Sequence, residues 1–164
     1  MKTAYLSLGA NLGDREANIR KALDLLKESG VEVRRVSSFY KTEPVEFRAQ
    51  PWFVNCAAEV ATDLMPMQLL KAVKSVERAF GRRSGIPKGP RPMDIDILFF
   101  EKAIVHTAQL TIPHERLAER KFVLIPLREL AADLRHPATQ RTVLEMLKEA
   151  SDTSQVMKLR QGGS

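Results

Sequence analysis

The order in which apolar periodicity changes along the chain limits the possible folds more than any other feature. A two-residue alternation is typical of a half-buried strand, and a stripe at i, i+3, i+4 and i+7 is typical of a helix that covers a core. The strand pattern occurs at residues 4–8, 31–40, 53–61 and 95–100, and the helix pattern at 19–26 and 66–80. The chain is therefore predicted to run strand, helix, strand, strand, helix, strand.

This order predicts an α+β fold of the ferredoxin-like βαββαβ type. Such folds have an antiparallel sheet that carries both helices on one face and leaves the other face to be covered or used. The rest of the chain predicts a C-terminal α/β extension, with an apolar segment at 122–130 and a helix started by Thr142 with Glu145 as its capping-box partner. We expect one domain over residues 1–150 and a polar, frayed tail over 151–164.

Bulk composition narrows the classes of protein without choosing a function. With 164 residues, 44% of them hydrophobic and 28% charged, the chain fits a single globular domain and not a disordered protein. Its net charge of +6 favours anionic partners, which include nucleotides, phosphorylated metabolites, nucleic acid and membrane surfaces. The single cysteine, Cys56, lies among apolar residues and predicts a reducing, cytoplasmic location. No apolar stretch approaches the roughly 20 residues of a membrane span.

Two aspartates, Asp94 and Asp96, begin the last predicted strand. Residues at i and i+2 of a strand project from the same face with Cα atoms about 7 Å apart, so both carboxylates can reach a shared pair of metal ions. Oxygen ligands suit Mg²⁺, which completes its shell with water and substrate phosphates. A solvent-facing acidic strand is the alternative. The basic loop before it, with Arg82 and Arg91, favours a metal site that bridges to polyphosphate, unless those charges only keep a surface loop soluble.

Further candidates for ligand contacts lie on either side of these aspartates. His114 and Arg120 both follow the aspartate strand and are suited to phosphate binding at its rim; a structural or exposed histidine is the alternative. Phe53 and Asn55 are two apart on a strand and face the same side. With Phe122 opposite, they would stack on and hydrogen-bond a flat heterocycle, unless Phe53 is core and Asn55 a satisfied buried amide.

Five short blocks, spread in order between about residue 3 and residue 149, match one known pattern. They are Gly9-Ala10-Asn11-Leu12-Gly13, Ser38-Phe39-Tyr40-Lys41-Thr42-Glu43-Pro44, Gln50-Pro51-Trp52-Phe53-Val54-Asn55, Gly89-Pro90-Arg91-x-x-Asp94-x-Asp96, and Pro113-His114 together with Arg120-x-Phe122. In these blocks the chain resembles the 6-hydroxymethyl-7,8-dihydropterin pyrophosphokinase family.

The resemblance implies transfer of the β,γ-pyrophosphate of ATP to the hydroxymethyl group of the pterin, with release of AMP, on the route to folate. It implies that Asp94 and Asp96 hold two Mg²⁺ ions and that Arg82 and Arg91 act with them in catalysis. The implied ATP site is Glu77, Arg82, Arg91, Ile97, His114 and Arg120, and the implied pterin site is Thr42, Pro44, Val45, Phe53, Asn55 and Phe122. ATP is then a co-substrate, and we expect a monomer that binds neither nucleic acid nor membrane.

Two other classes of protein are alternatives. A basic ferredoxin-like RNA-binding module would need exposed aromatic and basic side chains on its strand face, where this sequence places Asp94 and Asp96. Another Mg²⁺-dependent phosphoryl or nucleotidyl enzyme has no support, because no Gly-x-x-x-x-Gly-Lys-Ser/Thr motif occurs. No general base stands out, so we expect positioning and electrostatics to carry catalysis.

Overall fold

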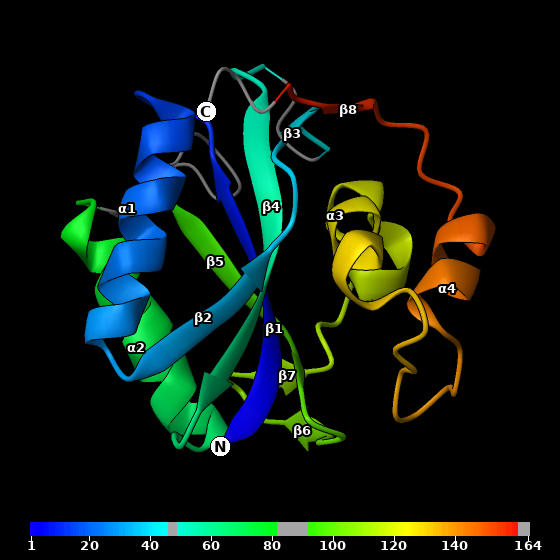
Figure 1. Ribbon diagram of the computed structural model, residues 1–164. Helices are drawn as coiled ribbons and strands as arrows, with labels where there is room; N and C mark the ends of the chain where they lie inside the picture. The colour runs from blue at the N-terminus through cyan, green and yellow to red at the C-terminus, as the bar shows by residue number, and fades with distance from the viewer. Residues whose placement is uncertain (46–48, 82–91, 161–164) are drawn as a thin grey trace.

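A six-stranded antiparallel sheet forms the centre of the molecule (Figure 1). The computed structural model describes residues 1–45, 49–81 and 92–160. The sheet strands are β1 (Lys2–Ala10), β2 (Val31–Val36), β3 (Tyr40–Thr42), β4 (Phe53–Thr62), β5 (Asp94–Phe100) and β8 (Val156–Lys158). The helices are α1 (Arg15–Glu28), α2 (Pro66–Ala79), α3 (Lys121–Ala131) and α4 (Val143–Glu149). A separate hairpin of β6 (Val105–His106) and β7 (Thr111–Ile112) and a 3-10 turn (Leu117–Glu119) precede α3.

The strand order confirms the predicted ferredoxin-like topology. The sheet runs β5-β1-β4-β3-β8, and β2 also pairs with β4. The first and third predicted strands therefore lie side by side at the centre. The predicted strand over 31–40 is two strands, because the N–H of Ala57 donates to the Ser37 hydroxyl oxygen (2.8 Å) at the break between β2 and β3.

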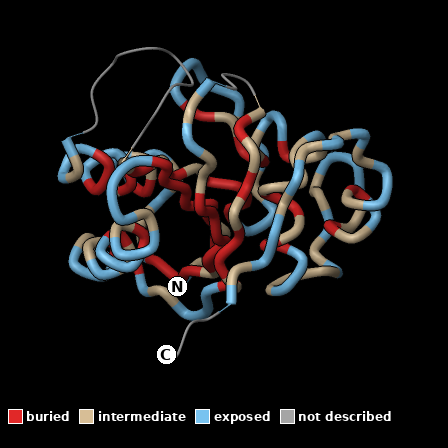
Figure 2. The backbone as a smooth tube through the Cα atoms, turned by 90° about the horizontal axis from the view of Figure 1, so that it is seen from above, coloured by how far each residue is buried: buried red, intermediate tan, exposed pale blue. Residues whose placement is uncertain are grey.

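Helices α1 and α2 cover one face of the sheet, where the larger part of the core lies. Their buried apolar residues are Ile19, Ala22 and Leu26 of α1 and Leu69, Val73 and Val76 of α2. Leu23, Leu70 and Phe80 also lie within the predicted helix patterns at 19–26 and 66–80, but they are only partly buried. In Figure 2 the buried positions run along the central strands and the inner sides of these helices.

The opposite face is covered only in part, by α3 and α4 (Figure 1). Tyr5, Ala57 and Phe99 of the sheet pack there against α3 and α4. The rings of Tyr5 and Phe99 meet edge to face, with centroids 6.5 Å apart. The predicted capping box at the start of α4 is confirmed: the N–H of Glu145 donates to Thr142 Oγ1 (3.0 Å), and the N–H of Thr142 donates to Glu145 Oε1 (2.8 Å).

The prediction that the tail frays is wrong for residues 156–158. These residues form β8, which pairs antiparallel with β3 at the edge of the sheet. The local sequence is polar, but the unpaired backbone groups of β3 offer this segment a full set of hydrogen-bond partners. Residues 161–164 lie outside the described residues. Among the helices that the structure describes, none combines the length and apolar character needed to span a membrane.

Candidate active site

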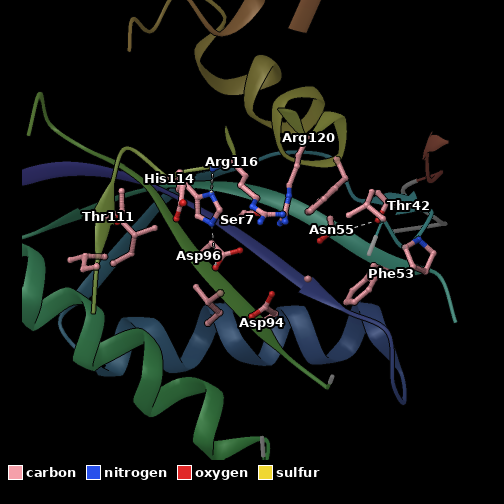
Figure 3. Close-up of a pocket in the computed structure, with 18 of the residues that line it drawn as sticks. Ser7, Thr42, Phe53, Asn55, Asp94, Asp96, Thr111, His114, Arg116 and Arg120 are labelled. Carbon is pink, nitrogen blue, oxygen red and sulfur yellow. Dashed lines mark hydrogen bonds and ion pairs between the residues drawn. The ribbon is translucent and has the colours of Figure 1, made fainter. Parts of the chain in front are cut away.

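Asp94 and Asp96 lie on the same face of β5, as the strand period predicts. Both are half-buried, whereas the two isoleucines that alternate with them belong to the core under α1 and α2. Across β1 the partner of Asp94 is Gly9 and the partner of Asp96 is Ser7. Because these partners are small, no large side chain of β1 covers the carboxylates. Figure 3 shows both carboxylates facing the same space above the sheet.

The uncovered half of the sheet face forms a cavity of about 400 Å³. It receives side chains from β1, β3, β4, β5 and α2 and from the segments around β7 and α3. The predicted site residues that line it are Thr42, Pro44, Val45, Phe53, Asn55, Asp94, Asp96, Ile97, His114, Arg120 and Phe122. The structure thus brings most of the predicted residues together around one space.

Asn55 is held in place at the end of the cavity that lies away from Asp96 (Figure 3). Its amide Nδ2 donates to Thr42 Oγ1 at 2.5 Å, and the residue is only 4% exposed. Gly9 is its partner on β1, and a Cβ atom there would lie 2.2 Å from Asn55 Oδ1. Glycine is therefore needed at this position for the amide to lie over β1.

His114 faces Asp96 from the segment that follows β7. The backbone N–H of His114 donates to Leu98 O (3.0 Å), which fixes the segment beside β5. Nδ1 accepts the N–H of Arg116 (3.2 Å), and Nε2 lies 3.9 Å from Asp96 Oδ1. A neutral His114 therefore carries its proton on Nε2, the nitrogen that faces the carboxylate.

Glu77 lies behind the carboxylate strand and does not line the cavity. It is 2% exposed, and its Oε2 accepts the backbone N–H of Ile95 at 2.8 Å, between the two aspartates. Lys74 Nζ lies 3.8 Å from the other oxygen, Oε1, and itself lines the cavity. Through this bond Glu77 holds the start of β5 and hence the direction of both aspartates.

The donor set at this end of the cavity fits Mg²⁺. Within the described parts of the chain, no three His, Cys, Asp or Glu side chains gather closely enough to hold a metal ion on their own. Two carboxylates on one strand face leave most coordination positions to water and phosphate oxygens, which is the pattern that Mg²⁺ prefers over an all-protein cage. Lys74, Arg116 and Arg120 supply positive charge around the same cavity.

A family model described as 7,8-dihydro-6-hydroxymethylpterin-pyrophosphokinase (HPPK) matches residues 5–132. The chain belongs to the HPPK family. The match includes the carboxylate strand and the residues of the cavity wall from Ser7 to Phe122, so the region of the resemblance and the region of the cavity coincide.

Several curated proteins are similar to this HPPK family member. The 2-amino-4-hydroxy-6-hydroxymethyldihydropteridine pyrophosphokinase of Bacillus subtilis is 43% identical over 137 residues, which cover 83% of this chain and 82% of that protein. Folic acid synthesis protein fol1 of Schizosaccharomyces pombe is 44% identical over 147 residues, 89% of this chain and 20% of that protein. The chain thus spans only about a fifth of the length of some of the relatives that it matches.

Solved structures support the HPPK fold. The crystal structure of wild-type Plasmodium falciparum HPPK-DHPS is similar with a TM-score of 0.70 and 16% sequence identity, over 90% of this chain and 44% of that chain. At this identity the likeness concerns the fold alone. It confirms the α+β architecture with an antiparallel sheet and packed helices.

Two of the predicted HPPK site residues, Arg82 and Arg91, lie outside the described residues. Sequence reasoning also missed cavity residues, among them Ser7, Gly9, Lys74 and Arg116. The alternation of β1 places Ser7 and Gly9 on one face with Tyr5, so pairing β1 with the aspartate strand would have found them. Lys74 is one helical turn before Glu77, which is the only local signal for it.

Proposed function

We propose that this chain transfers the pyrophosphate group of ATP to the hydroxymethyl group of 6-hydroxymethyl-7,8-dihydropterin and releases AMP. The observation that carries the proposal is a single cavity with two chemically different ends. Asp94 and Asp96 line one end, Asn55 and Phe53 line the other, and Phe122 also lines the cavity. A polyphosphate chain and a flat heterocycle would therefore be held next to each other, and fixed proximity lowers the barrier of a two-substrate transfer.

Asp94 and Asp96 hold two Mg²⁺ ions in this proposal. When bound, the ions would supply positive charge that offsets the negative charge developing on the transferred group. The support is the paired oxygen donors on one strand face and the small residues, Ser7 and Gly9, opposite them. The buried Glu77, through its bond to the backbone of Ile95, keeps the donors oriented.

Positive side chains hold the phosphates. Arg116, Arg120 and Lys74 line the cavity, and an arginine offers a planar pair of N–H donors to phosphate oxygens. Arg82 and Arg91 stay predicted phosphate ligands and catalytic residues. His114, with its Nε2 directed at the carboxylate end, donates to a phosphate oxygen or to Asp96.

The pterin ring lies at the other end of the cavity. Asn55 is already oriented by Thr42, so little side-chain freedom is lost when its amide pairs with the ring edge. Phe53 and Phe122 flank the ring, and the backbone around Pro44 and Val45 completes its rim. The proton of the substrate alcohol leaves to solvent or phosphate, because the two aspartates are committed to metal.

The alternative of an RNA-binding module has less support. Such modules stack bases on aromatic side chains exposed on the strand face. Here Phe99 is 1% exposed, and Tyr5 packs partly buried in the cluster under α3 and α4. The open part of that face carries Asp94 and Asp96, which repel phosphates in the absence of metal.

The test is to mix the purified chain with ATP, Mg²⁺ and 6-hydroxymethyl-7,8-dihydropterin and to follow AMP and the pterin diphosphate. We expect both products in equal amounts, and neither when the pterin or Mg²⁺ is left out. Release of ADP in place of AMP, or no nucleotide product at all, would reject the proposal.

We further propose that the enzyme works in the cytoplasm as a monomer. The support for a reducing compartment is the single, buried Cys56. Burial raises the pKa of its thiol to about 12, so the thiol is inert. A single cysteine cannot form a disulfide within the chain. The monomer prediction is tested by sedimentation of the purified chain.

A further inference from the structure

The C-terminal segment 151–160 is bonded to two walls of the cavity although it does not line the cavity itself. We propose that this segment, the C-terminal strap, is a positioning element for the pterin end of the site. The inference rests on the proposed function, because it assigns the strap to one of the two substrates. In Figure 1 the strap leaves α4, passes α3 and reaches β3 as β8.

The first attachment of the strap is to the wall formed by β3. Val156 pairs with Thr42, the residue that orients the Asn55 amide. One residue further on, the N–H of Glu43 donates to Gln155 O at 3.0 Å, and the N–H of Gln155 donates to Glu43 Oε1 at 3.2 Å. Thr42 and Glu43 both line the cavity. Without the strap, β3 would be a three-residue edge strand whose backbone pairs, within the described residues, with β4 alone.

The second attachment is to the first turn of α3. Arg120, at the N-cap position, makes no side-chain capping bond. Asp152 of the strap supplies it instead: the N–H of Lys121 donates to Asp152 Oδ2 at 3.1 Å, and the N–H of Ser154 donates to Oδ1 at 2.8 Å. A carboxylate at a helix N-terminus also interacts favourably with the helix dipole. The residues on either side of Lys121, Arg120 and Phe122, line the cavity.

The pKa of Asp152 agrees with this capping role. Partial burial raises the pKa, but the N–H groups of Ser154 and Lys121 and the charge of Lys121 outweigh burial and hold it below its ordinary value. The carboxylate is therefore charged throughout the neutral range and caps α3 continuously.

The two attachments together define which substrate the strap affects. One fixes Thr42 and, through it, Asn55; the other fixes the first turn of α3, whose Phe122 also lines the cavity. The strap thus sets the gap into which a flat ring fits. Asp94 and Asp96 belong to β5, which lies at the opposite edge of the sheet from β8. Loosening the β3 attachment should therefore weaken pterin binding and leave nucleotide binding nearly unchanged. Loosening the α3 attachment, which also holds the phosphate ligand Arg120, should weaken pterin binding more than nucleotide binding.

Met157 allows the β8 attachment to be broken with a matched control. This residue is 53% exposed, and it pairs with Lys41. Glu43 donates to Gln155 O, and Leu159 donates to Phe39 O. In an antiparallel pair every second residue pair is hydrogen-bonded, so Met157, which lies midway between Gln155 and Leu159, also directs its N–H toward β3. Met157→Pro removes this donor, whereas Met157→Ala removes only the side chain. We expect Met157→Pro to raise the Kd for the pterin roughly tenfold and Met157→Ala to leave it within about twofold.

The cap on α3 is tested with Asp152→Ala, and Thr153→Ala at the neighbouring exposed position is its control. Removing a capping carboxylate should raise the Kd for the pterin roughly fivefold. Pterin binding is followed by the fluorescence of the ring, and binding of a non-hydrolysable ATP analogue is followed by calorimetry. Both are measured well below the Tm of each variant, so that every sample is folded.

A selective rise in the Kd for the pterin supports the strap. An unchanged Kd in Met157→Pro and Asp152→Ala, or equal rises for the pterin and the ATP analogue, would overturn it, because a purely structural role affects both ligands or only the Tm. Failure of the proposed function is recognised separately: the unaltered chain would then bind the pterin without producing AMP, or would not bind it at all.

Discussion

The two halves of the sheet face under α3 differ, although the same three strands, β1, β4 and β5, build both. In the covered half, Tyr5, Ala57 and Phe99 pack against α3 and α4 and close the interior. In the open half, the same strands carry Ser7, Gly9, Asn55, Asp94 and Asp96. On β1 and β5 the side chains thus change from aromatic rings to small or acidic groups within two or three residues, and on β4 they change from alanine to asparagine.

This difference shows how one strand can serve both stability and chemistry. A strand exposes every second side chain on one face, so a change in side-chain volume along that face decides where a helix can pack and where a cavity stays open. The register between β1 and β5 sets Gly9 beside Asp94 and Ser7 beside Asp96. The bulge between Tyr5 and Leu6 lies at the border between the two halves.

The largest expected effect comes from removing a carboxylate in the open half. Asp94→Ala or Asp96→Ala should lower kcat by about 10³-fold or more, equal to about 4 kcal/mol of transition-state stabilisation, because a metal ligand is lost. The free energy of unfolding should stay close to that of the unaltered chain. AMP production and urea denaturation measure the two quantities.

Asp24→Ala, on the exposed side of α1, is the control for loss of a carboxylate and should keep full activity. Full turnover by either Asp94→Ala or Asp96→Ala would show that these carboxylates do not hold the metal. The open half would then no longer be identified as the half that carries the chemistry.

The next largest effect concerns stability in the covered half. Phe99 is 1% exposed and meets Tyr5 edge to face, so Phe99→Ala should lower the free energy of unfolding by about 3 kcal/mol through lost burial and a cavity. Denaturation in urea measures the loss. The folded fraction should keep its KM values, because Phe99 does not line the cavity; a large rise in either KM would mean that the halves are not independent.

Gly9→Ala tests the open half directly, because it adds a Cβ atom at a position where the structure has only backbone. The new Cβ would lie 2.2 Å from Asn55 Oδ1, so the amide must leave its position beside Thr42. We expect the Kd for the pterin to rise roughly 30-fold, about 2 kcal/mol. Ser7→Ala, which only removes a hydroxyl at the next position on the same face, is the control. An unchanged Kd in Gly9→Ala would show that the Asn55 amide does not hydrogen-bond the pterin ring.

The smallest effect is a pH-dependent one in the covered half. Glu59 accepts hydrogen bonds from Arg35 Nη2 (2.5 Å) and Tyr5 Oη (3.1 Å), and Arg35 also donates to Leu130 O (2.7 Å) of α3. The Arg35 hydrogen bond holds the pKa of Glu59 below its ordinary value, although partial burial opposes it. The stabilisation is therefore present above the unfolded-state pKa and is lost as the pH falls through the lower, folded-state pKa.

Glu59→Gln should accordingly cost about 1 kcal/mol at pH 7, and the difference from the unaltered chain should shrink below about pH 4. Denaturation at both pH values measures it. Glu32→Gln, whose carboxylate lies in an exposed pair 4.0 Å from Arg34, is the control and should change little. A cost that is the same at both pH values would show that the charge of Glu59 has no part in it.

Much of the fold could be predicted because its signals are local. The helical stripes, the capping box of Thr142 and the order of strands and helices along the chain can all be predicted within short windows, and the structure confirms them. The errors have long-range causes. The tail pairs with β3 because that edge has free backbone groups, and no pattern within 151–160 indicates this.

The site was predictable to the extent that its residues form short motifs. Asp94 and Asp96 share a face because the strand period is two residues, and Phe53 and Asn55 line the cavity for the same reason. Glu77 is different: its helix contributes the carboxylate to the backbone of β5 and not to the cavity. Arg116 reaches the site only because the chain turns back along β5 after β7.

The sequence by itself determined on which face of its strand or helix each side chain lies, and therefore which ligand donors share a face, because these depend on periods of two and 3.6 residues. Only the tertiary structure decided which distant segments share the cavity, that small residues of β1 lie beside the carboxylates, and that the C-terminal strap joins β3 to α3. The physical reason is that register and edge pairing are settled by contacts between segments far apart in the chain, and no local pattern encodes such partners.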